Sequence, residues 1–172
     1  SYYLANDITI DATYTQKFKG ILDGRGHTVT TSVPLFTDLS GTVRNLNVKG
    51  EVVGNADTDN GAVAITTTGN ARFEKVIVNA NVSGGNRSGA LLGYGINGSS
   101  VIAINCINNG SISGTGSSGG FIGYTAGTTL YLDGCINNGS VNSDNNSAGF
   151  VGRFGLNQAT TKHICYITNC DN

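Results

Sequence analysis

Charged side chains are scarce in this chain of 172 residues, where they make up 12% of the total and leave a formal net charge of −1. No stripe of lysine and arginine exists, so binding to nucleic acid or to an anionic membrane surface has no electrostatic basis. No apolar run reaches about 18 residues, which argues against insertion into a membrane as a helix. Methionine is absent, and the chain opens in a strand-like segment without a signal peptide. We therefore expect a mature secreted product or an excised fragment.

Proline and helical periodicity are also nearly missing. The chain has one proline against 26 glycines, and no stretch keeps an apolar period of about 3.6 residues over three turns, which excludes helical repeats. Short runs rich in Val, Ile, Phe, Thr and Tyr instead alternate with Gly, Asn and Ser, which predicts strands joined by turns. An apolar content of 38% is enough for a single domain with a narrow core.

What the sequence does contain is a block that recurs three times. Its copies begin at Val76, Cys106 and Cys135, so the period is 30 and then 29 residues. A fixed period of this size indicates a stacked array of repeats. Its length and composition fit one coil of a parallel β-helix, built from three short strands and three bends.

Equivalent residues of successive coils are expected to stack in columns about 4.8 Å apart. Five such columns are apolar, as the core of a solenoid requires. They are Leu46, Val76, Cys106, Cys135 and Cys170; Val52, Val82, Ile112 and Val141; Val63, Leu91, Phe121 and Phe150; Ala64, Leu92, Ile122 and Val151; and Val43, Phe73, Ala103, Leu132 and Ile167.

The glycine-rich end of each copy carries a family resemblance. Its Gly-(Ala/Gly)-apolar-apolar-Gly pattern, at 89–93, 119–123 and 148–152, resembles the GLUG-type repeat of extracellular surface proteins, and residues 2–8 and 18–29 resemble the first coil of such proteins. The resemblance implies a right-handed parallel β-helix and says little about activity. We therefore predict an all-β, single-domain right-handed parallel β-helix (β-solenoid) of about five coils, with roughly 30 residues per coil.

The predicted solenoid spans the whole chain, 1–172. Residues 1–42 form an atypical first coil or N-terminal cap, and 165–172 open a further coil. The repeat coils between them are 43–75, 76–105, 106–134 and 135–164.

Two further columns accompany the apolar ones, one polar and one of glycines. The first, made of Lys49, Asn79, Asn109 and Asn138, predicts a partial ladder of side-chain amides at a bend. The second consists of the glycines at 93, 123 and 152, which are expected where a bend needs positive φ or where two backbones approach closely.

The chain has four cysteines, Cys106, Cys135, Cys165 and Cys170. Because Cys106 and Cys135 are neighbours in one column, we favour a Cys106–Cys135 disulfide together with a Cys165–Cys170 disulfide. The alternative is a column of reduced thiols in the core. No Cys-x-x-Cys pair occurs and both histidines are distant in sequence, so we expect no zinc site.

Six Asn-x-Ser sequons fall at predicted bends or loops, where a glycosylating enzyme could reach them. They are Asn81, Asn86, Asn97, Asn109, Asn138 and Asn145. Asn109 and Asn138 are open to two interpretations, as members of the ladder or as glycan carriers, since one side chain cannot be both.

No catalytic constellation is recognisable. Glu74 and Asp133 lie two coils apart, about 9.6 Å by strand spacing, at the wide limit for an inverting glycosidase pair. Ile104 separates them, and Arg44 beside Glu74 predicts only a surface ion pair. An acidic segment at 55–61 resembles an imperfect EF-hand loop, for which a solvated loop is the alternative. We expect no enzyme, no cofactor and no metal.

Tyr94 and Tyr124 form a column above Arg153, which predicts either a contact for sugars or a partner protein, or a half-buried aromatic stack. The C-terminal residues look like the opening of another coil, and an open coil end invites strand addition, so we expect head-to-tail self-association. The leading hypothesis is a non-enzymatic, extracellular or cell-surface structural protein that builds a fibre, filament or surface layer. The alternatives are an adhesin or glycan-binding module of a larger surface protein, and a polysaccharide-active enzyme.

Overall fold

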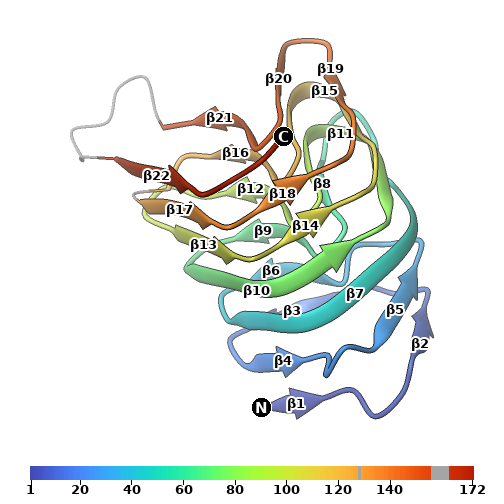
Figure 1. The fold of residues 1–172 in the computed structure, drawn as a ribbon. Coiled ribbons are helices and arrows are strands. Elements are labelled where there is room, and N and C mark those ends of the chain that lie inside the picture. Colours follow the sequence, from blue (N-terminus) through green and yellow to red (C-terminus); the bar gives the residue numbers. More distant parts are fainter. Residues whose placement is uncertain (128, 156–162) are drawn as a thin grey trace.

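The structure, a computed structural model, describes residues 1–127, 129–155 and 163–172. It is an all-β parallel solenoid without helices in this described part, which confirms the predicted fold class. The coils follow one another from the N-terminal to the C-terminal end (Figure 1). Across residues 1–127, 129–155 and 163–172, no helix has the length and apolar character needed to cross a membrane.

Each full coil contributes strands to three faces, and all paired strands are parallel. The first face contains β1 (Tyr2–Tyr3), β2 (Ile8–Ile10), β4 (Ile21–Asp23), β5 (Thr28–Thr31), β7 (Thr42–Val53), β10 (Asn70–Val78), β13 (Ser100–Ile104), β14 (Ile107–Asn108), β17 (Thr129–Asp133), β18 (Ile136–Asn137) and β22 (Ile164–Thr168). The second contains β8 (Asp59–Gly61), β11 (Asn81–Gly89), β15 (Ile112–Gly119), β19 (Val141–Ser143) and β20 (Asn146–Ala148). The third contains β3 (Tyr14–Phe18), β6 (Phe36–Leu39), β9 (Ala64–Thr67), β12 (Leu92–Gly95), β16 (Ile122–Thr125) and β21 (Val151–Phe154).

The solenoid has about four full turns rather than the predicted five. Residues 1–42 account for the difference, because they hold two short layers instead of one long coil. Tyr2 pairs with Leu22 and Leu22 pairs with Val43, so each layer takes only about 20 residues. These layers lack strands on the second face, which begins with the end of β7, where Glu51–Val53 pair with β11. The last predicted coil includes 156–162, which lie outside the described residues.

The strand register reproduces the predicted apolar columns. One of these columns, on the first face, consists of the successive register partners Val43, Phe73, Ala103, Leu132 and Ile167. Phe73 and Phe121 are fully buried, and the Phe121 and Phe150 rings stack 6.1 Å apart. Each fully buried side chain of this size contributes about 1.5–3 kcal/mol to the folded state. Stacking like residues therefore builds a continuous core from coils that are individually too thin to have one.

The predicted glycine column is explained by close approach, not by positive φ. Gly93, Gly123 and Gly152 lie outside the left-handed region. A Cβ atom on Gly123 would lie 2.5 Å from the Ser88 amide nitrogen. Only glycine leaves room for the backbones that meet there.

Left-handed backbone occurs instead at another bend, immediately before the column that contains the cysteines. The residues with positive φ there are Asn45 (49°), Lys75 (51°), Asn105 (52°), Gly134 (61°) and Asn169 (52°). Gly and Asn adopt this conformation at low cost, whereas a lysine does so under strain. The same left-handed bend therefore recurs from coil to coil, although the residues at this position differ in how easily they adopt a positive φ.

Candidate functional site

The predicted tyrosine column is present on the outer side of the third face. The column consists of successive register partners on four strands: Thr66 on β9, Tyr94 on β12, Tyr124 on β16 and Arg153 on β21. The Tyr94 and Tyr124 rings lie 5.3 Å apart at 31°. Tyr124 is only 8% exposed, and its hydroxyl donates a hydrogen bond to the Gly155 carbonyl at 3.0 Å. The column thus forms a half-buried aromatic stack, and its contact with sugars or a partner protein stays a prediction.

Two arginines cover this stack. The Arg87 guanidinium lies 3.7 Å from the Tyr94 ring centroid, and the Arg153 guanidinium lies 4.9 Å from that of Tyr124. Both distances are within the range of cation–π attraction. Arg153 was expected from the repeat alignment, whereas Arg87 was missed because it comes from β11, on a different face.

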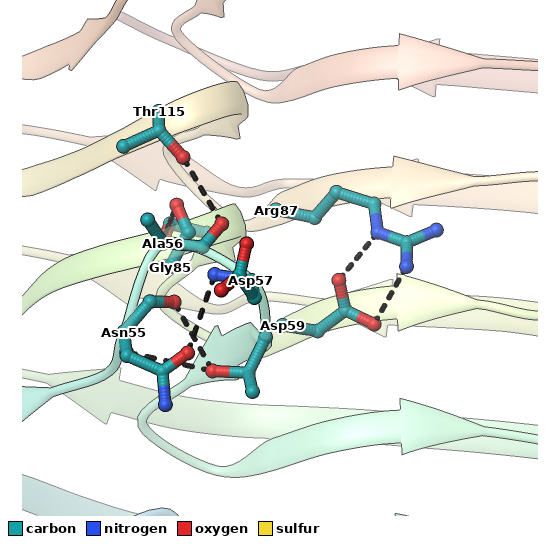
Figure 2. A network of polar contacts seen from close by, with 9 residues as sticks. Asn55, Ala56, Asp57, Asp59, Gly85, Arg87 and Thr115 are labelled. Carbon is teal, nitrogen blue, oxygen red and sulfur yellow. Dashed lines mark hydrogen bonds and ion pairs between the residues drawn. The ribbon is translucent and has the colours of Figure 1, made fainter.

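Arg87 is held in place by Asp59, its register partner on β8. Two guanidinium nitrogens of Arg87 donate to the two carboxylate oxygens of Asp59 (Figure 2). Burial raises the pKa of the Asp59 carboxyl above its ordinary value, although Arg87 acts in the opposite direction. The bidentate bond fixes the guanidinium plane over Tyr94 and leaves the remaining N–H groups of Arg87 to donate elsewhere.

A polar cleft of about 520 Å³ opens beside the stack. It is lined by side chains from three successive coils: Asn86 and Arg87 from the first, Tyr124 from the second, and Asn145, Asn146 and Arg153 from the third. The Asn145 Nδ2 donates to the Thr115 carbonyl at 3.0 Å and the Asn146 Nδ2 donates to the Ser117 hydroxyl at 3.3 Å. Each amide is thereby oriented with its oxygen left to accept hydrogen bonds.

The acidic segment at 55–61 forms a turn held by its own polar groups and by Thr115 of β15. The Asn55 Oδ1 accepts from the Asp57 amide at 3.2 Å, and the Thr115 hydroxyl donates to the Ala56 carbonyl at 3.3 Å (Figure 2). The Asp59 carboxylate is engaged by Arg87. Within the described ranges, no cluster of three or more His, Cys, Asp or Glu side chains could hold a metal ion.

The sequons differ in what their amides contact. Asn109 donates to Asn79 and Asn138 donates to Asn109, both at 2.8 Å, so the predicted ladder forms along these three residues. The Asn81 Nδ2 donates to Glu51 at 2.7 Å. Asn86 and Asn97 are exposed, Asn86 at the cleft and Asn97 in the turn before β13. Glycosylation at all six positions stays a prediction.

A second amide ladder was missed by the sequence analysis. The Asn108 Nδ2 donates to the Asn137 Oδ1 at 2.8 Å, and the Asn137 Nδ2 donates to the Asn172 Oδ1 at 2.7 Å. Asn108 and Asn137 are buried. Their equivalent in an earlier coil is Val78, the register partner of Asn108, so this column changes from apolar to polar along the solenoid.

All four cysteines are free thiols in the structure. Cys106 and Cys135 are buried in the predicted column, and the Cys135 amide donates to the Cys170 Sγ at 3.4 Å. The hydrogen bond with Cys106 lowers the pKa of the Cys135 thiol to about 7, and the pKa of Cys106 is raised by the same bond and by burial. Cys165 is exposed on β22, where it pairs with Leu130. The two proposed disulfides stay predictions.

The register places Arg44, Glu74, Ile104 and Asp133 in one row, as predicted. The expected ion pair between Arg44 and Glu74 is wrong, however. The Arg44 Nε donates to Asp23 at 2.9 Å, one layer back, while Glu74 pairs with Arg72 on its own strand. The strand register determines which residues are neighbours, but a long charged side chain can reach several of them. The register alone therefore does not determine its ion-pair partner.

Comparison with known proteins supports the fold. No protein-family model matches the chain, and no curated protein sequence matches it. The chain is similar to the crystal structure of an immunoglobulin A1 protease candidate from Bacteroides ovatus, with a TM-score of 0.66 and 17% identity. The match covers 96% of this chain but only 56% of that structure. At this identity, the similarity establishes a shared solenoid architecture.

Proposed function

We propose that this chain is a non-enzymatic, extracellular module that binds saccharides in the cleft beside Tyr124. The observation that carries the proposal is the convergence of two guanidinium groups and three side-chain amides on one open cleft, from the first and third of three successive coils. Sugars present several hydroxyl groups at fixed spacing, and they are bound through donors and acceptors that are equally fixed. The parallel register supplies that rigidity here.

The proposal corresponds to the adhesin or glycan-binding alternative. It accords with the GLUG-type resemblance of the glycine-rich repeats, since such repeats occur in surface proteins. A non-catalytic role is supported by the position of the carboxylates, because no acidic residue is among the described residues that line the cleft. Glycosidase chemistry needs a pair of carboxyl groups beside the bound sugar.

A glycan array tests the proposal. The wild-type chain is expected to bind a defined subset of glycans. An Asn86→Ala, Asn145→Ala double variant should lose at least about 90% of that signal, because both amides lie in the cleft. Arg72→Gln, on the first face and outside the cleft lining, is the control and should bind as the wild type does. Mass spectrometry of the recovered glycan should show an unchanged chain length. Absence of binding, or equal binding by the cleft variant, would refute the proposal.

Head-to-tail self-association is a second candidate, favoured by a separate observation. The large apolar side chains that the described residues expose lie, with the exceptions of Val53 and Ile136, in the first and last layers of the solenoid. Tyr2 is 63% exposed at one end, and Tyr166 is 55% exposed at the other. Stacking one copy on the next would bury both surfaces and form a filament. Electron microscopy at neutral pH distinguishes filaments from dispersed particles, and dispersed particles would contradict this candidate.

A further inference from the structure

We propose that the cleft selects saccharides that carry a carboxylate, such as uronic or sialic acids. This inference rests on the proposed saccharide-binding function and names its ligand class. The first observation is the charge of the lining, which includes Arg87 and Arg153 and no acidic side chain among the described residues. A neutral sugar needs no cation, so two guanidinium groups in one small cleft indicate an anionic group in the ligand.

The two arginines are not equivalent. Arg87 already binds Asp59 through two nitrogens, so its charge is largely compensated. Arg153 has no carboxylate partner among residues 1–127, 129–155 and 163–172, and it lies at the exposed side of the cleft. Of the two, Arg153 is the guanidinium that has its full set of donors available for a carboxylate.

Arg153 is also oriented before any ligand arrives. Its guanidinium lies over the Tyr124 ring, which is itself fixed by the hydrogen bond from its hydroxyl to Gly155. A planar guanidinium presents paired N–H groups that match the two oxygens of a carboxylate. Restricting its orientation in advance reduces the entropy lost on binding.

The amides complete the complementarity. Asn145 and Asn146 use their nitrogens on the protein and keep their oxygens as acceptors. Sugar hydroxyls donate to such oxygens. The cleft therefore offers a cationic donor at Arg153 and neutral acceptors beside it, which matches a pyranose ring that carries both a carboxylate and hydroxyl groups.

The test uses matched glycans on one array. Uronate- and sialate-bearing oligosaccharides are compared with their methyl esters, which keep the ring and remove the charge, and with sulfated glycans. The wild-type chain is expected to bind the carboxylates at least about tenfold more tightly than the esters. Arg153→Gln should abolish this preference, so that the variant binds the acids and their methyl esters with equal affinity. Arg72→Gln should behave as the wild type.

The outcomes separate the two proposals. Equal binding of acids and esters by the wild-type chain would overturn the carboxylate inference and leave the saccharide site intact. Tighter binding of sulfated than of carboxylated glycans would also overturn it. A lack of binding to every glycan would overturn both. Because the ester comparison uses the wild-type chain, the test does not depend on how Arg153→Gln folds.

Discussion

The Asn108 side chain donates a hydrogen bond to Asn137, its equivalent one coil later, at 2.8 Å within the interior of the solenoid. Asn108 is fully buried and also bonds the amide and carbonyl groups of Gly110. The Asn108 side chain thus provides hydrogen-bond partners for the backbone groups of the bend and for the Asn137 side chain at the same time. A buried amide with fewer partners would destabilise the fold.

Removal of the Asn108–Asn137 hydrogen bond should therefore lower the free energy of unfolding more than removal of an equivalent hydrogen bond at the surface. Asn137→Ala deprives the buried Asn108 amide of one of its two acceptors and should lower the free energy of unfolding by about 1–3 kcal/mol. Asn138→Ala, the next residue, removes an exposed rung of the other ladder, where water replaces the lost bond, and should change it by less than about 0.5 kcal/mol. Urea denaturation measures both, and similar costs would contradict the distinction.

Lys75 occupies a bend position at which glycine should be preferred. Its φ of 51° is strained for a lysine, whereas Gly134 takes the same position at 61° without strain. We expect Lys75→Gly to stabilise the fold by about 0.5–1 kcal/mol, after allowance for the flexibility of glycine in the unfolded chain. Gly134→Ala should destabilise it. Thermal denaturation gives the sign of each change, and a lower melting temperature for Lys75→Gly would refute this account.

Arg87 and Asp59 should contribute unequally to stability. Arg87→Gln leaves a largely buried carboxylate without its cation and should cost about 1.5–3 kcal/mol. Asp59→Asn should cost less, because burial already raises the pKa of this carboxyl and so opposes its charged form. Urea titrations of both variants and of the double variant measure the coupling between them. Arg72→Gln, which breaks a more exposed pair, is the control and should cost at most about 1 kcal/mol. A larger cost for Asp59→Asn than for Arg87→Gln would contradict the prediction.

Asp23 should make stability depend on pH in the acid range. Hydrogen bonds from the Asn45 side chain and the Arg25 amide, together with Arg44, hold the pKa of this carboxyl below its ordinary value of 3.8. Its contribution is therefore present above that value and is lost as the pH falls through the lower, folded-state pKa. Between about pH 5 and about pH 2, Asp23→Asn should show a shallower loss of unfolding free energy than the wild type. Parallel curves would rule out this role for Asp23.

The cysteines should differ in their accessibility to alkylation. Iodoacetamide at neutral pH should modify the exposed Cys165 first and the buried Cys106 only after unfolding. Mass spectrometry after timed labelling identifies the modified positions. Equal labelling of Cys106 and Cys165 would contradict the buried column, and recovery of a Cys106–Cys135 disulfide would support the bridged alternative.

The sequence by itself determined the solenoid, because a period of 29–30 residues stacks like positions and apolar columns must be buried together. It also placed Tyr94 and Tyr124 in one column and predicted the exposed asparagine ladder. It overcounted the full coils, because residues 1–42, which lack the repeat, form two short layers without strands on the second face instead of one full coil.

Only the tertiary structure decided how side chains from different faces meet. The period identifies the neighbours of a residue in the next coil, but it contains no information about which strand of another face lies beside it. The position of Arg87 over Tyr94 and the cleft that Arg87 helps to line both depend on that arrangement. The buried Asn108–Asn137 pair likewise depends on which way a bend turns its amides, and strand periodicity leaves that direction undetermined.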